Sequence, residues 1–333
     1  MQPDYRLSIA PMMAYTDRHY RYMVRQFTRR TLLYTEMVVG TTISYNLNNK
    51  RVLDRVLGFH PVEHPVAVQL GGDDAGVLAL AAKVCEDYGY DEINLNIGCP
   101  SDKVQKGRFG VCLMKEPAHV ASLVEAMRHA VAIPVTVKHR IGVDDQEDYS
   151  FLHRFVAQVS ETGGADVFAV HARKAWLKGL SPAQNRSVPP LDYGKVYRLK
   201  QDFPHLKVVI NGGIQDLNEA ENHLNHVDGV MIGRAAYQHP EMFCAADERI
   251  FGEPHQQPPT AEAMIDTMNH YLHAEIAKGA RISWIAKHLV GLFKNRPNAR
   301  KWRQSITHLI QENPSEFDLN QLYRNTIGVT LVS

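Results

Sequence analysis

Residues that could take part in chemistry follow short apolar runs along much of the chain. Cys99 lies in the segment Asn94–Pro100 (NLNIGCP), as a thiol between a glycine and a proline. A thiol in this position can donate or accept a proton in acid–base catalysis, so we predict that Cys99 is a catalytic acid. Cys85, Cys112 and Cys244 lie in apolar surroundings, and we expect them to be small core residues.

Two glycine-containing segments have the composition of an anion-binding pair. The first is Asn211-Gly212-Gly213, and the second is Gly233-Arg234. Glycine lets backbone N–H groups approach an anion because no Cβ stands in the way, and Arg234 adds a positive charge. The pair predicts a phosphate-binding site for either a phosphorylated substrate or a mononucleotide cofactor. The alternative is that both segments are simple tight turns.

Four more polar side chains end other apolar runs and could bind the polar edge of a planar heterocycle: Gln69, Asn94, Lys138 and His171. Lys138 could also stabilise negative charge on a reduced ring, which suggests flavin mononucleotide (FMN). The structural alternatives are a solvated cation for Lys138, a core histidine for His171 and a structural amide for Gln69. Further backbone and apolar contacts could come from Pro11, Met12 and Met13.

Eight short runs rich in β-branched residues are expected to form strands, because most are almost continuously apolar, as in a parallel sheet buried on both faces. They are Leu7–Met12, Leu32–Val38, Pro65–Leu70, Glu92–Ile97, Pro134–Arg140, Val167–His171, Val208–Asn211 and Gly229–Gly233. Helical spacing separates most of them. We expect a helix over Ala75–Tyr88 that buries Val77, Leu80, Ala81 and Val84, and one over Ala118–Val131 that buries Val120, Leu123, Val124 and Met127.

Eight strand–helix units in about 250 residues are typical of a (β/α)8 barrel, whereas a doubly wound sheet more often has five or six strands. We therefore predict an α/β fold, a TIM barrel over residues 1–252, followed by a C-terminal α-helical bundle over 253–333. Glu253–Thr260 has the composition of a linker, and helical periodicity begins at Ala261. Active sites of such barrels lie at the carboxyl ends of the strands, where all the candidate residues fall.

Composition limits the partners. The chain has 333 residues with 37 Lys and Arg against 36 Asp and Glu, so a nucleic acid must be met by a local patch. The four cysteines form no CxxC pair, and no secretory segment or long apolar run is present. We expect a cytoplasmic protein without disulfides, membrane spans or a metal site.

A local basic patch is present in the C-terminal part. No acidic residue occurs between Glu275 and Glu312, where Trp302 lies among eight cations: Lys278, Arg281, Lys287, Lys294, Arg296, Arg300, Lys301 and Arg303. Such a stretch is typical of a phosphate-binding surface. The alternative is a solvated helical face whose charge is balanced by acids of the barrel.

Several segments together resemble the tRNA-dihydrouridine synthases, specifically their bacterial A subfamily. They include APMMAYTDRHYR, YDEINLNIGCPSDKVQKGRFGVCLM, PVTVKHRIG, VHARKAWLKGLSP and DGVMIGRAAYQHP. The resemblance covers almost the entire barrel and continues into the helical part. It is a much stronger signal than any single glycine motif. It implies an FMN enzyme that takes a hydride from NADPH and reduces uridines 20 and 20a of the tRNA D-loop to 5,6-dihydrouridine.

The resemblance also implies roles for individual residues. Hydride would pass from flavin N5 to C6 of uracil, Cys99 would give a proton to C5, and Asn96 would hydrogen-bond the target base. FMN would be bound by Pro11, Met12, Met13, Gln69, Lys138, His171, Asn211, Gly212, Gly213, Gly233 and Arg234. The tRNA would be oriented by Arg186, Arg300 and Arg303, and the enzyme is expected to act as a monomer. Relatives commonly carry Lys at the position of Ala183, which bears on one tRNA contact.

Three other interpretations remain open from the residues. An FMN barrel could act on a free small molecule, although the basic C-terminal part and Arg186 argue against it. A lyase or isomerase could use the same phosphate site, with Lys138 as a base or Schiff-base lysine. A tRNA-binding chaperone would leave the Cys99 thiol without a purpose.

Overall fold

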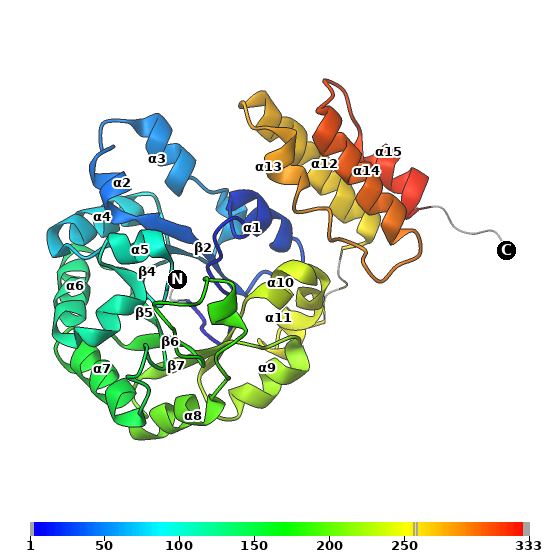
Figure 1. The fold of residues 1–333 in the computed structure, drawn as a ribbon. Helices are drawn as coiled ribbons and strands as arrows, with labels where there is room; N and C mark the ends of the chain where they lie inside the picture. The colour runs from blue at the N-terminus through cyan, green and yellow to red at the C-terminus, as the bar shows by residue number, and fades with distance from the viewer. Residues whose placement is uncertain (1–2, 256, 258, 329–333) are drawn as a thin grey trace.

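The computed structural model describes residues 3–255, 257 and 259–328. Its strands form a closed barrel in which each is parallel to the next and β8 returns to β1 (Figure 1). The strands are β1 (Leu7–Ile9), β2 (Leu32–Val39), β3 (Val66–Gly71), β4 (Glu92–Ile97), β5 (Val135–Arg140), β6 (Val167–His171), β7 (Lys207–Asn211) and β8 (Gly229–Ile232). The predicted (β/α)8 barrel is confirmed.

Helices surround the barrel and connect the strands. The α-helices are α1 (Arg18–Val24), α2 (Gly40–Ser44), α3 (Lys50–Leu57), α4 (Ala75–Asp87), α5 (Asp102–Lys106), α6 (Pro117–Ala130), α7 (Tyr149–Glu161), α8 (Tyr193–Asp202), α9 (Leu217–Leu224), α10 (Arg234–Gln238) and α11 (Ala246–Arg249). Short 3-10 helices occur at η1 (Pro61–Glu63), η2 (Gly110–Lys115), η3 (Gln184–Arg186) and η4 (Pro240–Ala245).

Strand β4 illustrates how the sequence places polar groups inside the barrel. Its leucine and isoleucines pack into the large core between strands and helices. Side chains alternate along a strand, so Glu92, Asn94 and Asn96 face the opposite side, the barrel interior. Register aligns Asn94 with Gln69 of β3 and with Thr136 of β5. A separate interior cluster of apolar side chains includes Tyr34, Ala67, Ala169, Val209 and Met231.

The buried face of α4 differs from our prediction. We expected Leu80 to be buried, but it is 41% exposed. The buried residues are Leu78, Ala81, Ala82 and Cys85. Both sets have helical spacing, and the observed set contains three small side chains that let α4 pack closely against α6. In α6 the prediction is confirmed, since the buried apolar residues are Val120, Ala121, Leu123, Val124 and Met127.

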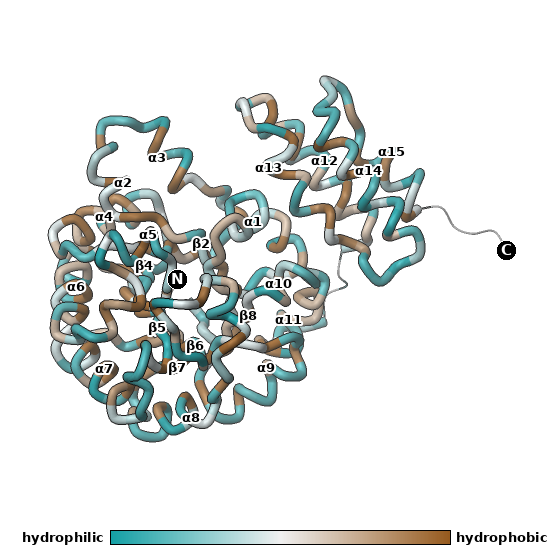
Figure 2. The backbone as a smooth tube through the Cα atoms, viewed as in Figure 1, coloured by the Kyte–Doolittle hydropathy of each residue, from teal (hydrophilic) through white to brown (hydrophobic). Residues whose placement is uncertain are grey.

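The C-terminal part consists of helices beside α1 (Figure 1). They are α12 (Ala261–Ala277), α13 (Ile282–Ala286), α14 (Ala299–Glu312) and α15 (Leu319–Thr326). Hydrophobic and hydrophilic segments alternate along them, as amphipathic helices require (Figure 2). Residues 256 and 258 of the expected linker lie outside the described residues. None of the helices in the described part of the chain is both long and apolar enough to cross a membrane.

Asp17 joins these helices to the barrel. It caps α1 by accepting the backbone N–H groups of His19 and Tyr20, and it pairs with Lys287 at 2.7 Å and His288 at 2.8 Å. Although burial opposes ionisation, hydrogen bonds from His288 and Lys287 hold the pKa of Asp17 well below its usual value. The C-terminal helices are therefore anchored beside the loop that follows β1.

Candidate active site

The predicted site residues of the barrel gather at the carboxyl ends of the strands. Register aligns Asn96 with Lys138 and His171 with Asn211 on neighbouring strands. Lys138 Nζ donates to Asn211 Oδ1 at 3.1 Å. The Arg234 guanidinium donates to the backbone oxygen of Arg186 at 3.2 Å, which brings together two residues from distant segments.

The site contains positive charge without a matching acid. Within the described residues, no carboxylate pairs with Lys138, Arg140 or Arg173. Burial and the nearby Arg140 lower the pKa of Lys138 to about 7. Burial, followed by Arg140 and Lys138, lowers the pKa of His171 far below its usual value. A bound anion would relieve this concentration of cations.

Several hydrogen-bonding groups of the site lack protein partners. The buried Nδ1 atom of His171 has none among the described residues. Within the same residues, the backbone N–H groups of Gly213, Gly233 and Arg234 meet no backbone acceptor. These donors and the unpaired cations suit an anionic ligand with several acceptor oxygens, as a phosphate ester has.

The glycines of the site differ in what they permit. Gly213 has a φ of +82°, and a Cβ there would lie 2.5 Å from Leu191 and 2.7 Å from the Tyr193 hydroxyl. Glycine is therefore required at this turn by backbone conformation and by packing. A Cβ on Gly233 would have only Ala10 and Met12 nearby, both at 3.9 Å, so space lies beside this glycine.

The loop after β1 forms another wall of the site. The backbone N–H of Met12 donates to Thr16 Oγ1 at 2.9 Å, and Met13 is 60% exposed. Ala14 has a positive φ of 68°, and its N–H donates to the Glu36 carboxylate. Lys287 Nζ lies 3.4 Å from the Ala14 oxygen, so the C-terminal helices contact this loop directly.

Cys99 is held in a well-connected loop. Asn96 Oδ1 accepts the backbone N–H groups of Gly98 at 3.1 Å and Cys99 at 3.0 Å. The half-buried thiol of Cys99 donates to Ser101 Oγ at 3.4 Å. Our prediction for the other cysteines is confirmed only for Cys85, which is buried. Cys112 and Cys244 are half-buried, because they lie in or beside short 3-10 turns rather than on the inner face of a long helix.

Arg140 ends the predicted strand Pro134–Arg140, and the sequence predicted no role for it. Its Nε donates to the Gly98 oxygen at 2.9 Å, and its Nη1 donates to the oxygens of Lys174 and Asn185. Gln105 likewise donates to Pro100 and Leu177. These bonds tie the Cys99 loop to the loop after β6. An arginine at the carboxyl end of a strand, where the other candidate residues fall, was the available indication.

The basic C-terminal patch is mostly unpaired. Lys278 pairs with Glu275 and Lys287 with Asp17, each below 3 Å. In the described part of the chain, no carboxylate lies within ion-pair distance of the other six, which are exposed: Arg281, Lys294, Arg296, Arg300, Lys301 and Arg303. Among the described residues, Lys287 is therefore the one cation of this patch whose charge is balanced by an acid of the barrel.

A groove of about 370 Å³ follows α14, lined by Arg300, Arg303, Gln304, Thr307, His308 and Gln311. Trp302 does not belong to this surface. It is fully buried, and its indole N–H donates to the Leu289 oxygen at 2.8 Å. The exposed aromatic residue of this part is Trp284, which is 45% exposed. The guanidinium of Arg281 lies 5.9 Å from its ring centre.

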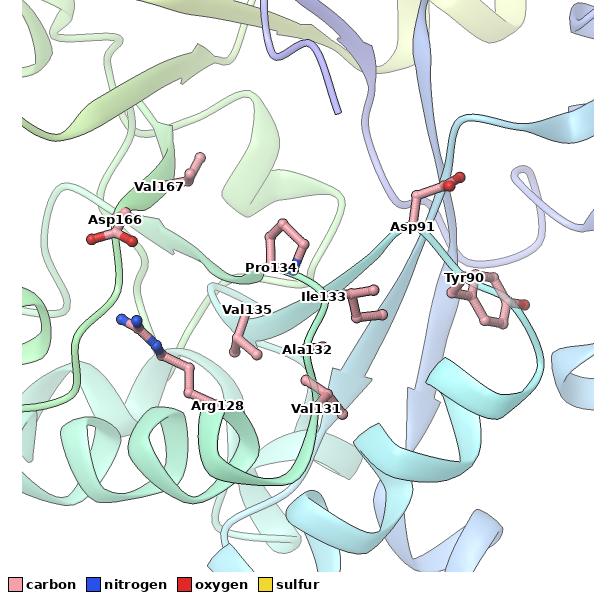
Figure 3. A pocket seen from close by; sticks show the side chains of 10 residues that line it. All are labelled: Tyr90, Asp91, Arg128, Val131, Ala132, Ile133, Pro134, Val135, Asp166 and Val167. Carbon is pink, nitrogen blue, oxygen red and sulfur yellow. The ribbon is translucent and has the colours of Figure 1, made fainter. Parts of the chain in front are cut away.

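A second cavity, of about 530 Å³, lies at the other end of the barrel (Figure 3). It is formed at the amino-terminal ends of β4, β5 and β6, and its polar side chains include Asp91, Arg128 and Asp166. Catalytic groups of TIM barrels lie at the opposite face, so this cavity is remote from Cys99 and Lys138.

A family model described as dihydrouridine synthase matches residues 8–326, which span both the barrel and the C-terminal helices. The chain belongs to the dihydrouridine synthase family. The resemblance found in the sequence is thereby confirmed. The match includes α12 to α15 as well as the strands, so it covers both parts of the molecule.

Curated relatives within the family are similar over nearly their whole length. A Vibrio parahaemolyticus protein named tRNA-dihydrouridine(20/20a) synthase is 52% identical over 302 residues, covering 91% of this chain and 90% of that protein. A Salmonella typhi protein of the same name is 52% identical over 305 residues, covering 92% and 90%. The Escherichia coli K12 protein of this name is 51% identical over 302 residues, covering 91% and 86%.

Solved structures show the same fold at low sequence identity. Morphinone reductase has a TM-score of 0.50 and 13% identity, covering 77% of this chain and 88% of that chain. A complex of 2-naphthoyl-CoA reductase has a TM-score of 0.52 and 9% identity, covering 75% of this chain and 50% of that chain. At such identities the similarity concerns the barrel fold alone.

Proposed function

We propose that this dihydrouridine synthase uses FMN and NADPH to reduce the C5=C6 bond of uracil at positions 20 and 20a in the tRNA D-loop. The observation that supports this most strongly is the juxtaposition at the barrel mouth. Lys138 and Arg140, which pair with no carboxylate among the described residues, lie beside the constrained loop that presents the thiol of Cys99, and unpartnered backbone N–H groups follow β7 and β8 at the same end of the barrel. The names of the relatives support the choice of nucleotides.

The residues that would bind FMN divide by chemistry. The phosphate would take the N–H groups of Gly212, Gly213 and Gly233 and the charge of Arg234. Amide and cationic groups would meet the polar edge of the ring, while the loop after β1 would supply apolar and backbone contacts. The groups at the polar edge of the ring are Gln69, Lys138, His171 and Asn211, and the loop residues are Pro11, Met12 and Met13. The buried, unpartnered Nδ1 of His171 supports this fit.

The chemistry that bound FMN would supply, after reduction by NADPH, is the transfer of hydride to C6 of uracil. Cys99 donates the proton that completes C5. Lys138 and Arg140 place positively charged side chains near the thiol that gives up this proton. Asn96 hydrogen-bonds the base, and its oxygen keeps the Cys99 backbone in place.

Binding of tRNA is assigned to the C-terminal helices and to the loop after β6. We propose residues 1–252 as the catalytic domain and 253–333 as the tRNA-binding domain, with Arg186, Arg300 and Arg303 contacting phosphates. The six unpaired cations support this assignment, because phosphate contacts supply most of the affinity of such surfaces. The target uridine must leave its stack to reach the barrel mouth. One chain contains both surfaces, which supports action as a monomer.

One observation also suits the lyase that the sequence left open. An amine with a pKa of about 7, as for Lys138, could act as a base or form a Schiff base at neutral pH. The same low value follows from burial of Lys138 beside Arg140, and a bound anion would raise it again. Family membership favours the flavin, so we do not propose the lyase.

The test compares Cys99→Ala with Cys112→Ala, a matched loss of a half-buried thiol. Both variants and the parent protein receive FMN, NADPH and unmodified tRNA, and dihydrouridine is quantified by mass spectrometry. We expect Cys99→Ala to bind FMN but lose most of its activity, by about 100-fold or more for a lost proton donor. Full activity of Cys99→Ala would contradict the assigned role, and no dihydrouridine from the parent would contradict the proposed function.

A further inference from the structure

A chain of hydrogen bonds crosses the barrel interior from the Cys99 loop to the amino-terminal end of β4. It connects strands β3, β4 and β5, and four of its members are at most 1% exposed. We call it the interior chain, and its members in order are Asn96, Gln69, Asn94, Thr136 and Glu92. The proposed function gives roles to Asn96 and Gln69 but none to Asn94, Thr136 and Glu92.

The upper half of the interior chain consists of side-chain amides. Asn96 Nδ2 donates to Gln69 Oε1 at 2.7 Å, and Gln69 Nε2 donates to Asn94 Oδ1 at 2.8 Å. The lower half continues in the same sense. Asn94 Nδ2 donates to Thr136 Oγ1 at 2.8 Å. The Thr136 hydroxyl in turn donates to Glu92 Oε1 at 2.6 Å. Every donor therefore points from the loop toward Glu92.

Both ends of the interior chain fix this direction. At the loop, Asn96 Oδ1 accepts the backbone N–H groups of Gly98 and Cys99, which can only donate. At the other end, Glu92 Oε1 accepts the hydroxyl hydrogen of Tyr34 at 2.8 Å as well as that of Thr136. A reversed amide anywhere between would place donor against donor or acceptor against acceptor.

The direction does not depend on whether Glu92 carries a proton. Burial raises the pKa of Glu92 to about 7. Its Oε2 atom makes no hydrogen bond at normal distance among the described residues, although the buried Tyr5 hydroxyl lies near this carboxyl group, whereas Oε1 already accepts two hydrogen bonds. The proton of the neutral form therefore resides on Oε2, and Oε1 remains an acceptor in both forms.

We propose that Glu92 is a positioning residue that acts through the interior chain to fix the orientation of the Asn96 amide. The amide oxygen is thereby committed to the Cys99 loop, and the second N–H of Asn96 is left for a ligand. The O4 carbonyl of uracil can accept this N–H, whereas the amino group that cytosine carries at the same ring position cannot. This last step rests on the proposed function.

The test breaks the interior chain at Thr136, which lies between Asn94 and Glu92 and belongs to neither proposed binding site. Thr136→Val removes the hydroxyl at nearly constant volume, and Thr136→Ser retains it. With unmodified tRNA, Thr136→Val is expected to lower kcat by about 10-fold to 100-fold through misplacement of Asn96 and Cys99. KM for tRNA should change by less than about twofold, because the basic helices supply most of the affinity for tRNA. Thr136→Ser should restore kcat.

A second readout requires neither tRNA nor flavin. The alkylation rate of Cys99 by iodoacetamide, followed by peptide mass spectrometry, reports how firmly Asn96 holds the loop. Thr136→Val should raise this rate several-fold, and Thr136→Ser should not. Tyr34→Phe is the matched control, because it removes the other hydroxyl from Glu92 Oε1 and leaves the interior chain intact. If Thr136→Val does not fold, Thr136→Ala takes its place.

Two results would overturn the proposal. One is a parental kcat and alkylation rate in both Thr136→Val and Thr136→Ala. The other is an equal loss in Thr136→Ser or Tyr34→Phe, which would indicate a merely structural effect. Should the parent protein itself form no dihydrouridine, the proposed function fails, and the alkylation rates alone still decide whether Glu92 positions the loop.

Discussion

The unpaired cations of the C-terminal helices lead to a quantitative prediction about salt. Arg300 and Arg303 line the same groove on α14, and among the described residues neither has a carboxylate partner. If both contact phosphates, each contributes about 0.7–0.9 to the slope of log affinity against log salt concentration. The double variant Arg300→Ala/Arg303→Ala should therefore lower that slope by roughly 1.6.

The matched control is Lys278→Ala. Lys278 lies in the same basic stretch but pairs with Glu275 at 2.8 Å, so its charge is already compensated. Binding of unmodified tRNA is measured by fluorescence anisotropy between 50 and 200 mM salt. Over this fourfold range of salt, the factor by which affinity falls should be about tenfold smaller for the double variant than for the parent. Lys278→Ala should follow the parent closely. Equal slopes for all three proteins would refute the tRNA surface described above.

Four further predictions concern the barrel and its contact with the helices. Lys138→Met should weaken FMN binding by about 10-fold or more, because a charge-assisted hydrogen bond is lost. In the parent, FMN affinity should fall above pH 7, where free Lys138 loses its proton, by up to about tenfold per pH unit; titrations of apoprotein with FMN test both effects. Asp17→Ala should lower the free energy of unfolding by roughly 2–4 kcal/mol, since it removes a helix cap and leaves the Nε2 atom of buried His288 without its partner, and Asp17→Asn should cost less because it keeps the cap. Burial lowers the pKa of His139 to about 4, so its contribution to stability is complete above about pH 7 and is lost as the pH falls below its unfolded value of about 6.5. In the parent, His139 should contribute about 2 kcal/mol to the fall in the free energy of unfolding between pH 8 and pH 5. Urea unfolding at the two pH values should show that this part of the fall is missing in His139→Phe.

The strands could be predicted because parallel strands buried on both faces have a distinctive pattern. Glu92–Ile97 and Val167–His171 have the predicted bounds. The first strand is shorter than expected and ends at Ile9, because Pro11 lacks an N–H for the ladder and the chain turns toward Thr16. The rotation of α4 could not be predicted, because two apolar stripes have equal spacing and only the neighbouring helices decide between them.

The site was predictable as far as position along a strand reveals it. Cys99, Lys138, His171 and the two glycine segments all lie in the last residues of strands or shortly after them, and the fold brings those ends together. The partners of Arg140 could not be foreseen, since it bonds to backbone oxygens of loops 34 to 45 residues away. Trp302 was placed by the sequence among cations, but its burial depends on how α13 and α14 pack.

The direction of the interior chain was likewise invisible in the sequence. The alternation of polar residues in β4 indicates that Glu92, Asn94 and Asn96 share a face. Which atom donates and which accepts depends on Gln69 and Thr136 from other strands, and on the loop that returns its N–H groups to Asn96. Tertiary structure alone supplies that information.

The central claim is that this barrel reduces uridine in tRNA with FMN, and an absorbance experiment tests it most directly. The purified protein, reconstituted with FMN, is mixed anaerobically with NADPH and then with unmodified tRNA in the same cuvette. Our account predicts flavin bands that bleach with NADPH and return when tRNA is added, in proportion to the dihydrouridine formed. A protein that cannot bind FMN, or bands that stay bleached in the presence of tRNA, would contradict it.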